Sequence, residues 1–150
     1  METDWTVHPI GVVRSKIKTP SDAPKQGALE GTEAEVVVYP EYAEALAGLE
    51  RRVLGKGDPA REGAPTGKIV VLCWMHEADR GRLKVHPRGQ EDRPERGVFS
   101  TRSPHRPNPV SLHTVELLGI DGAVLRVRGM DAIDGTPVID IKPHSPGLDG

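Results

Sequence analysis

The sequence has few aromatic residues and almost no cysteine. Phe, Trp and Tyr make up 3% of its 150 residues, so any core must be built mainly from aliphatic side chains. The single cysteine, Cys73, excludes an internal disulfide, and no export signal is recognisable. No apolar run approaches the roughly 20 residues that a membrane-spanning helix needs. We therefore expect one domain over residues 1–150, in the cytoplasm and without a membrane partner.

Residues that favour turns are abundant instead, with 14 prolines and 17 glycines. Frequent turns suit short strands better than long helices. Runs of β-branched and apolar residues predict strands at residues 7–14, 34–39, 68–75, 110–118, 123–128 and 138–141, and a weak strand at 82–86. The sequence thus predicts a mainly β fold of about seven strands, in which an antiparallel sheet curls or closes into a barrel.

Other elements are expected to be few. One helix is predicted at residues 41–54, where apolar side chains recur at helical spacing, with Gly55 as its C-cap. Asp121-Gly122 predicts a two-residue hairpin turn. Long polar loops, chiefly residues 15–32, complete the chain, and loops of this length are often functional.

Two short motifs match known sites only formally. Residues 55–60 fit the Gly-x-Gly-x-x-Ala dinucleotide pattern, but that pattern needs a strand before it and a helix after it, and neither is predicted here. His76-Glu77 starts a zinc-protease-like motif, in which Arg80 stands where the second histidine belongs. The six histidines do not pair at a metal-ligand spacing, so no metal site is predicted.

The segment with the clearest chemical content is a proline-rich strip at residues 97–109. Pro104, Pro107 and Pro109 fix their own backbone angles and disfavour the helical conformation in the residues before them. The side chains of Arg102, His105 and Arg106 therefore lie on a stiff, extended, non-helical segment and lose less entropy when they meet a ligand. The alternative is an ordinary proline-rich surface loop with solvated arginines.

Charge is unevenly distributed, although the net charge is only −2. Residues 80–108 contain eight Lys or Arg and three Asp or Glu, a local charge of +5, which leaves −7 for the rest of the chain. A basic segment on an acidic protein suits RNA phosphate, and a solvated charged loop is the alternative. Residues 81–96 hold no aromatic side chain for base stacking, so phosphate contacts are expected instead. The expected contacts are Arg82, Arg88, Arg93 and Arg106.

The strip resembles the central signature of the TsaA-like, or TrmO, family; it reads Gly97-Val98-Phe99-Ser100-Thr101-Arg102-Ser103-Pro104-His105-Arg106-Pro107-Asn108-Pro109. Residues 134–143 resemble the second signature of the same family. The resemblance covers roughly residues 8–146 and implies a β-barrel that binds S-adenosylmethionine, typically as a homodimer. The best-known members methylate N6-threonylcarbamoyladenosine beside the tRNA anticodon. Some members carry an additional C-terminal domain, which is not expected here.

The resemblance also implies which residues hold the cofactor: Pro24, Lys25, Gln26, His76, Glu77, Arg102, Leu112, Gly129, Met130, Asp131 and Asp134. Lys25 stands where the family has Arg and lacks the planar, two-pronged donor, and Ser111 stands where the family often has Gly. Arg102 is expected to meet the carboxylate of the methyl donor, while Asp131 and Asp134 meet its positive or hydroxyl groups. The strip and this acidic bend are thus expected to converge on one cavity.

These assignments predict an S-adenosylmethionine-dependent tRNA (adenine-N6) methyltransferase, with tRNA and not DNA as its nucleic-acid partner. The acceptor nitrogen belongs to a urea and is a weak nucleophile, so its alignment with the donor should contribute most. A general base would help, with Asp134 and His76 as candidates, but none is strictly required. Two alternatives stay open: a methyltransferase of the same fold that acts on a small molecule or another RNA, and a non-catalytic S-adenosylmethionine-binding module.

Overall fold

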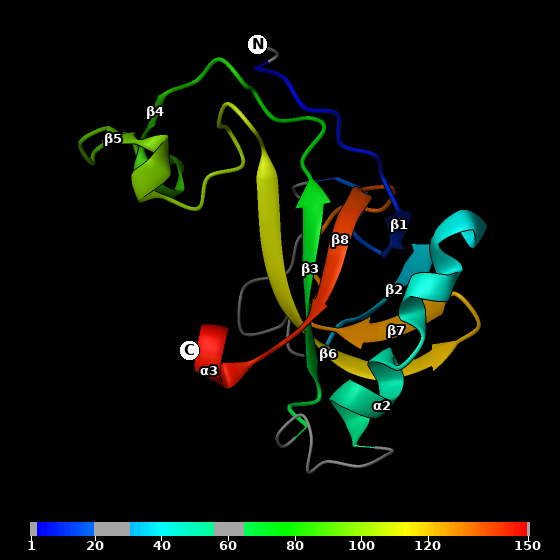
Figure 1. Cartoon of the computed structure of the whole chain (residues 1–150). Helices are drawn as coiled ribbons and strands as arrows, with labels where there is room; N and C mark the ends of the chain where they lie inside the picture. The colour runs from blue at the N-terminus through cyan, green and yellow to red at the C-terminus, as the bar shows by residue number, and fades with distance from the viewer. Residues whose placement is uncertain (1–2, 20–30, 56–64, 150) are drawn as a thin grey trace.

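The computed structural model describes residues 3–19, 31–55 and 65–149. Within these residues, six strands form a closed antiparallel barrel in the order β1-β2-β7-β6-β3-β8 (Figure 1). The strands are β1 (Gly11–Arg14), β2 (Glu33–Val38), β3 (Lys68–Trp74), β6 (Val110–Asp121), β7 (Val124–Arg128) and β8 (Pro137–Pro143). The prediction of a mainly β, antiparallel barrel is confirmed.

Two further strands form a separate sheet outside the barrel. These are β4 (Lys84–Val85) and β5 (Arg96–Gly97), and they carry the short 3-10 helices η3 (Pro87–Gly89) and η4 (Val98–Ser100). We call residues 81–100 the excursion, because Figure 1 shows them standing away from the barrel between β3 and β6. The weak strand predicted at 82–86 is shortened to two residues, since this charged, turn-rich segment offers β5 only a brief partner.

The interior of the barrel is aliphatic, as the scarcity of aromatic residues requires. On β6, Val115 and Leu117 alternate with outward-facing residues and are each 2% exposed. Strand β3 is buried on both faces, because Val71 faces the interior and Val70, on the opposite face, is also only 6% exposed. The remaining core comes from the other barrel strands, β1, β2, β7 and β8, and includes Val13, Val36, Val38, Leu125, Val127 and Val138.

The single helix predicted at residues 41–54 is in fact two short helices. The 3-10 helix η2 spans Pro40–Leu46 and the α-helix α2 spans Leu49–Leu54. They are separated at Gly48, whose φ of 85° lies in the left-handed region that residues with a side chain rarely adopt. Gly55 caps α2 as predicted.

Two boundaries at the far end of the barrel complete the description. The β6–β7 hairpin turns at Gly122 and Ala123, one residue later than predicted, because Asp121 still pairs with Val124. A last helical turn, α3 (Pro146–Asp149), follows β8. Among the described residues, no helix has the length and apolar character needed to cross a membrane.

One end of the barrel collects the segments on which the site depends. Strands β1, β3 and β7 end there, and β2, β6 and β8 begin there. The segments that follow β1, β3 and β7 therefore meet at this end, together with the proline-rich strip that leads into β6. The antiparallel register thus brings together segments that are far apart in the sequence.

Candidate functional site

A cavity of about 360 Å³ opens at this end of the barrel. Its volume lies within the range of about 300–1,000 Å³ that is usual for small-molecule sites. The wall combines apolar side chains with two carboxylates and two imidazoles. It is formed by Ile17, Met75, His76, Glu77, Ala78, Pro104, His105, Asp131, Ile133 and Thr136.

Backbone hydrogen bonds tie the segment after β3 to the strip. The Met75 N–H donates to the Pro109 carbonyl at 2.8 Å, and the Asp79 N–H donates to His105 Nδ1 at 2.9 Å. Because Nδ1 of His105 accepts, a neutral imidazole carries its proton on Nε2. These two bonds hold residues 75–78 of the cavity wall in a fixed relation to Pro104 and His105 of the strip.

Two arginines fix the strip further. The Nε–H of Arg80 donates to the Pro107 carbonyl at 2.7 Å, and its guanidinium lies 5.2 Å from the centroid of the Trp74 ring. The guanidinium of Arg106, predicted to contact RNA, donates at 2.9–3.2 Å to the carbonyls of Val98, Thr101 and Ser103. The expected stiffness of the strip therefore depends on these donors as well as on its prolines.

A chain of four side chains connects the barrel core to the cavity wall. His113 Nδ1 lies 2.7 Å from Asp131 Oδ1, and His113 Nε2 lies 2.7 Å from Ser111 Oγ. Ser111 is in turn the cross-strand neighbour of Cys73 on β3. We call these four residues the relay. His113 is only 11% exposed, whereas the Asp131 side chain is 47% exposed and borders the cavity.

The charge states within the relay follow from its contacts. The hydrogen bond from His113 holds the pKa of Asp131 below its ordinary value, against a smaller opposing effect of burial. Burial, and then the charge of Asp131, raise the pKa of the Cys73 thiol to about 12. Asp131 is therefore an ionised acceptor at neutral pH, so His113 donates from Nδ1. A neutral His113 then accepts from the Ser111 hydroxyl at Nε2.

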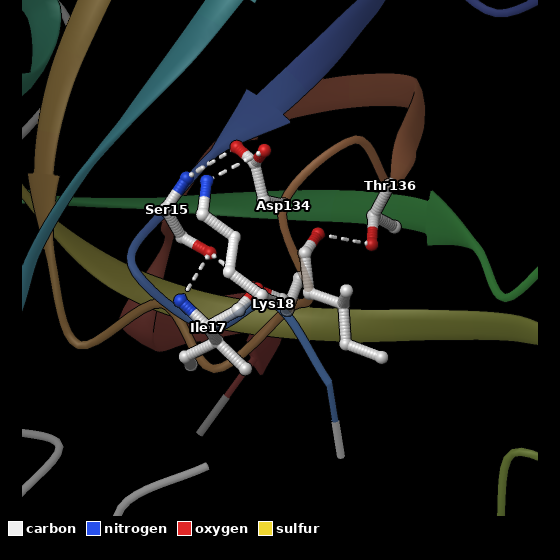
Figure 2. A network of polar contacts seen from close by, with 7 residues as sticks. Ser15, Ile17, Lys18, Asp134 and Thr136 are labelled. Carbon is white, nitrogen blue, oxygen red and sulfur yellow. Dashed lines mark hydrogen bonds and ion pairs between the residues drawn. The ribbon is translucent and has the colours of Figure 1, made fainter. Parts of the chain in front are cut away.

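Asp134 has a different role from Asp131. Its carboxylate accepts from the backbone N–H of Ser15 at 3.0 Å and from Lys18 Nζ at 2.9 Å (Figure 2). The Lys18 bond, and next the Ser15 bond, lower the pKa of Asp134. The Ser15 hydroxyl also donates to the Ala132 carbonyl at 2.9 Å, so the segment after β1 is fastened to the segment before β8.

The structure brings together three of the predicted cofactor residues, since His76, Glu77 and Asp131 all border the cavity. Arg102 and Asp134 are not among its described lining residues: Arg102 is exposed, and Asp134 lines a separate hollow with Lys18 and Arg126.

Three further predicted cofactor residues are not among the described lining residues of the cavity. Leu112 is 50% exposed, Met130 is fully buried in the core, and Gly129 directly follows β7 with its N–H bonded to the Thr32 carbonyl. Pro24, Lys25 and Gln26 lie outside the described residues.

The predicted RNA-binding residues are mostly on the excursion. Arg82 and Arg93 are exposed there, and Arg82 Nε lies 3.8 Å from Asp79 Oδ2. The side chain of Arg88 is outside the described part of the structure.

As far as residues 3–19, 31–55 and 65–149 are concerned, no three His, Cys, Asp or Glu side chains are arranged to hold a metal ion.

Sequence reasoning did not assign His105, Ile17, Ile133, Thr136 or His113 to the site. For His105 and Thr136 a signal existed, because each lies in one of the two signatures. For His113 the spacing to Ser111 was a signal, since residues two apart on a strand share a face. The partner of His113, Asp131, follows from the register of the β6–β7 hairpin, which pairs Glu116 with Arg128 beyond a bulge between Leu117 and Gly119.

Comparison with known proteins gives a consistent result. The family model of the tRNA-methyltransferase O N-terminal domain matches residues 61–150. A probable S-adenosyl-L-methionine-binding protein of Methanothermobacter thermautotrophicus is 50% identical over 143 residues, which are 95% of this chain and 92% of that protein. An S-adenosyl-L-methionine-binding protein of Archaeoglobus fulgidus is 45% identical, over 94% of this chain and 90% of that protein.

Solved structures agree with these relatives. A crystal structure of TrmO from Pseudomonas aeruginosa matches with a TM-score of 0.72 and 30% identity, and a second TrmO crystal structure matches with a TM-score of 0.73 and 32% identity. Each match covers 98% of this chain but only 58% and 60% of the solved chains. The relatives, the matched model and the shared barrel together show that this chain belongs to the family of the tRNA-methyltransferase O N-terminal domain.

Proposed function

We propose that this chain is an S-adenosylmethionine-dependent methyltransferase that methylates N6-threonylcarbamoyladenosine beside the tRNA anticodon, as a cytoplasmic homodimer. The observation that carries the proposal is the cavity at the end of the barrel, which joins His76, Glu77 and Asp131 to the signature strip. Two relatives, 50% and 45% identical, are named as S-adenosyl-L-methionine-binding proteins, and this supports the cofactor. The TrmO structures support the reaction class.

The residues of the cavity fit an adenosyl sulfonium compound. Glu77 and Asp131 offer negative charge to its ammonium and sulfonium groups, and the lowered pKa of Asp131 keeps that side chain ionised. Ile17, Met75 and Ile133 offer an apolar surface to a flat base. The other predicted cofactor residues remain part of the proposal: Pro24, Lys25, Gln26, Arg102, Leu112, Gly129, Met130 and Asp134.

The contribution of the chain is mainly one of alignment. When bound, S-adenosylmethionine supplies a methyl group on a positively charged sulfur. The rigid strip and the segment after β3 hold the acceptor nitrogen in line with that group, which suits a weak nucleophile. The nitrogen loses its proton as the new N–C bond forms, and a nearby base would accept that proton.

Of the two candidate bases, His76 has the better position. It borders the cavity, whereas Asp134 is bonded to Lys18 and Ser15 and is not among the described lining residues. The lowered pKa of Asp134 also makes it a weaker base. We therefore assign the proton-accepting role, where one is needed, to His76, and a fastening role to Asp134.

The excursion gives the RNA a place to dock. Exposed arginines such as Arg82 and Arg93 neutralise phosphates and fix the register of the RNA without reading its sequence. We retain Arg88 in the same role. Arg106 already satisfies three carbonyls, so its contribution to RNA binding is mainly to keep the strip in shape.

A transfer assay tests the proposal. The purified chain is incubated with methyl-labelled S-adenosylmethionine and unfractionated tRNA, which is then digested to nucleosides and separated. Label in the N6-methyl derivative of threonylcarbamoyladenosine is expected, and tRNA prepared without the threonylcarbamoyl group is the matched control. Label in other nucleosides would indicate a different RNA substrate. Calorimetric binding of the cofactor without transfer to any RNA would indicate a non-catalytic binding module.

A further inference from the structure

Two large apolar side chains face solvent where the excursion meets the strip. Phe99, the only phenylalanine of the chain, is 80% exposed on η4, and Leu83 is 65% exposed. The Leu83 carbonyl accepts from the N–H of Val98 at 2.9 Å, so a backbone hydrogen bond joins Leu83 to the residue before Phe99. Single exposed apolar residues are common on protein surfaces, but two on hydrogen-bonded segments, one of them aromatic, point to a partner.

The turn that carries Phe99 is rigid. Val98, its neighbour, is 2% exposed and its carbonyl accepts from the Thr101 hydroxyl at 2.9 Å. The guanidinium of Arg96 donates to the Ser100 carbonyl at 2.9 Å. The backbone is therefore fixed on both sides of Phe99, and little conformational entropy remains to be lost when a partner contacts the ring.

The surroundings of this pair are basic. Arg82 and Lys84 flank Leu83, and Arg96 and Arg102 lie within three residues of Phe99, in the segment with a local charge of +5. Protein-binding surfaces are usually depleted in lysine at their centre, and two copies of a basic surface repel each other. An aromatic ring set among cations is instead the composition of sites that bind single-stranded nucleic acid.

We propose that Phe99 is a stacking platform for one unpaired base of an RNA, and that the neighbouring basic residues contact the flanking phosphates. The inference rests on RNA as the substrate class proposed above and adds a base contact to the phosphate contacts of the arginines. Because a paired base has no free face, Phe99 favours a loop or another single-stranded segment over a duplex.

The test measures binding without catalysis. Fluorescence anisotropy gives the affinity of the full chain for a labelled single-stranded 12-nucleotide RNA, for the same RNA in a duplex, and for heparin, which has charge but no bases. Phe99→Ala is expected to weaken single-strand binding about tenfold, since stacking of one base is worth about 1–3 kcal/mol. Phe99→Trp should restore it and Phe99→Leu should not. Leu148→Ala, at a site 88% exposed on α3, is the matched control.

Duplex and heparin affinities should change less than about twofold in every variant, because phosphate contacts are retained. Unchanged single-strand affinity in Phe99→Ala would overturn the inference. So would a loss of self-association by Phe99→Ala in sedimentation velocity without a change in RNA affinity, which would make this face a protein interface. Failure of the proposed function looks different: RNA binds and depends on Phe99, but no methyl group is transferred.

The relay carries a second, independent inference. The carboxylate of Asp131 is half-exposed at the cavity, yet His113 holds it at 2.7 Å from the protein side. We infer that His113 is a positioning residue, which orients Asp131 toward the positive groups of an adenosyl ligand. Ser111 assists because its hydroxyl donates to Nε2 of His113. The imidazole proton then stays on Nδ1, from which it is donated to Asp131.

Variants of His113 test this role by calorimetry with S-adenosylhomocysteine. His113→Ala is expected to weaken binding about tenfold, as loss of a hydrogen bond to a charged group would. His113→Asn, whose amide N–H replaces the Nδ1 donor, should recover most of the affinity, whereas His113→Leu should not. Nitrogen NMR of the wild-type imidazole should show the proton on Nδ1. Equal affinity in all variants, or an asparagine variant that restores thermal stability but not affinity, would overturn the inference.

Discussion

Arg102 is the least constrained of the predicted cofactor residues. It is exposed, and within the described residues it makes no hydrogen bond or ion pair, whereas Arg106 of the same strip and Arg80, which contacts the strip, are engaged in hydrogen bonds. An arginine kept out of the structural network is available to a ligand carboxylate. This contrast among neighbouring arginines supports the proposed role of Arg102.

We predict that Arg102→Ala abolishes binding of S-adenosylmethionine and leaves the fold intact. Calorimetric titration should show no measurable heat of binding, while the thermal midpoint stays close to that of the wild type because Arg102 supports no other residue. Arg93→Ala, at another exposed arginine, serves as the control and should bind the cofactor normally. A tight titration by Arg102→Ala would count against the assignment.

The hydrogen bonds of Asp134 to Ser15 and Lys18 predict that the free energy of unfolding changes in acid. Its pKa is lowered in the folded state, so its stabilising effect is present above its unfolded pKa, which is near 4, and is lost as the pH falls through the lower folded value. Asp134→Asn should therefore lower the free energy of unfolding by no more than about 1 kcal/mol at neutral pH, since the pair with Lys18 is solvent-exposed. The difference should shrink below about pH 4. Urea titrations from pH 3 to pH 7 measure it, and a difference that grows in acid would contradict the prediction.

At the level of elements, the proline-rich strip begins at Gly97 of β5, passes through η4 and continues as a loop without sheet pairing up to β6. Its conformation is held by its prolines and by side-chain donors such as Arg80 and Arg106. Arg106 is central, because its guanidinium donates to the carbonyls of Val98, Thr101 and Ser103 and so ties η4 to the residues that follow it. A loop of this kind can position a ligand without the support of a sheet.

We predict that Arg106→Met lowers the free energy of unfolding by about 1–3 kcal/mol, because carbonyls in the strip lose their donors. Arg106→Lys should not restore it fully, since an ammonium group cannot reproduce the planar fork. Chemical denaturation of the two variants and of Arg93→Met gives the comparison. If Arg106→Met is as stable as the wild type but loses RNA affinity, the side chain serves RNA directly and not the strip.

An element could be predicted where its signal lies in neighbouring residues of the sequence, and could not where it depends on contacts formed only in the fold. The barrel strands were located to within about two residues from their β-branched and apolar runs, except that β1 starts only at Gly11 and β6 continues to Asp121. The helix was predicted as continuous because its apolar spacing continues across Gly48, where the chain in fact breaks. His76, Glu77 and Asp131 were predicted through the resemblance to the family. The pairing of His113 with Asp131 was not, because the register of the β6–β7 hairpin shifts at a bulge between Leu117 and Gly119 that the sequence does not reveal.

For the whole molecule, the uneven charge is the main determinant of how RNA would approach. Residues 80–108 carry a charge of +5 and the rest of the chain carries −7, so an anionic partner is guided toward this segment, which includes the excursion, and is repelled elsewhere. The cofactor cavity lies at the foot of this segment. The same charge distribution thus separates where a large anion docks from where a small cation binds.

We predict that RNA affinity falls steeply with salt and that cofactor affinity does not. In a plot of the logarithm of the RNA binding constant against the logarithm of salt concentration, Arg82→Gln and Arg93→Gln should each reduce the slope by about 1. Affinity for S-adenosylhomocysteine should remain nearly constant over the same salt range. A slope unaffected by both substitutions would mean that the RNA does not contact the excursion.

The link between β3 and β6 is one uninterrupted stretch that leaves the cavity at Met75, forms the excursion, and returns to the cavity at His105. An RNA bound to the excursion therefore acts on both ends of this stretch, which line the cavity. The RNA surface and the cofactor cavity are thus connected through one covalent segment. Release of either ligand should accordingly alter the residence time of the other, even though the two ligands do not touch.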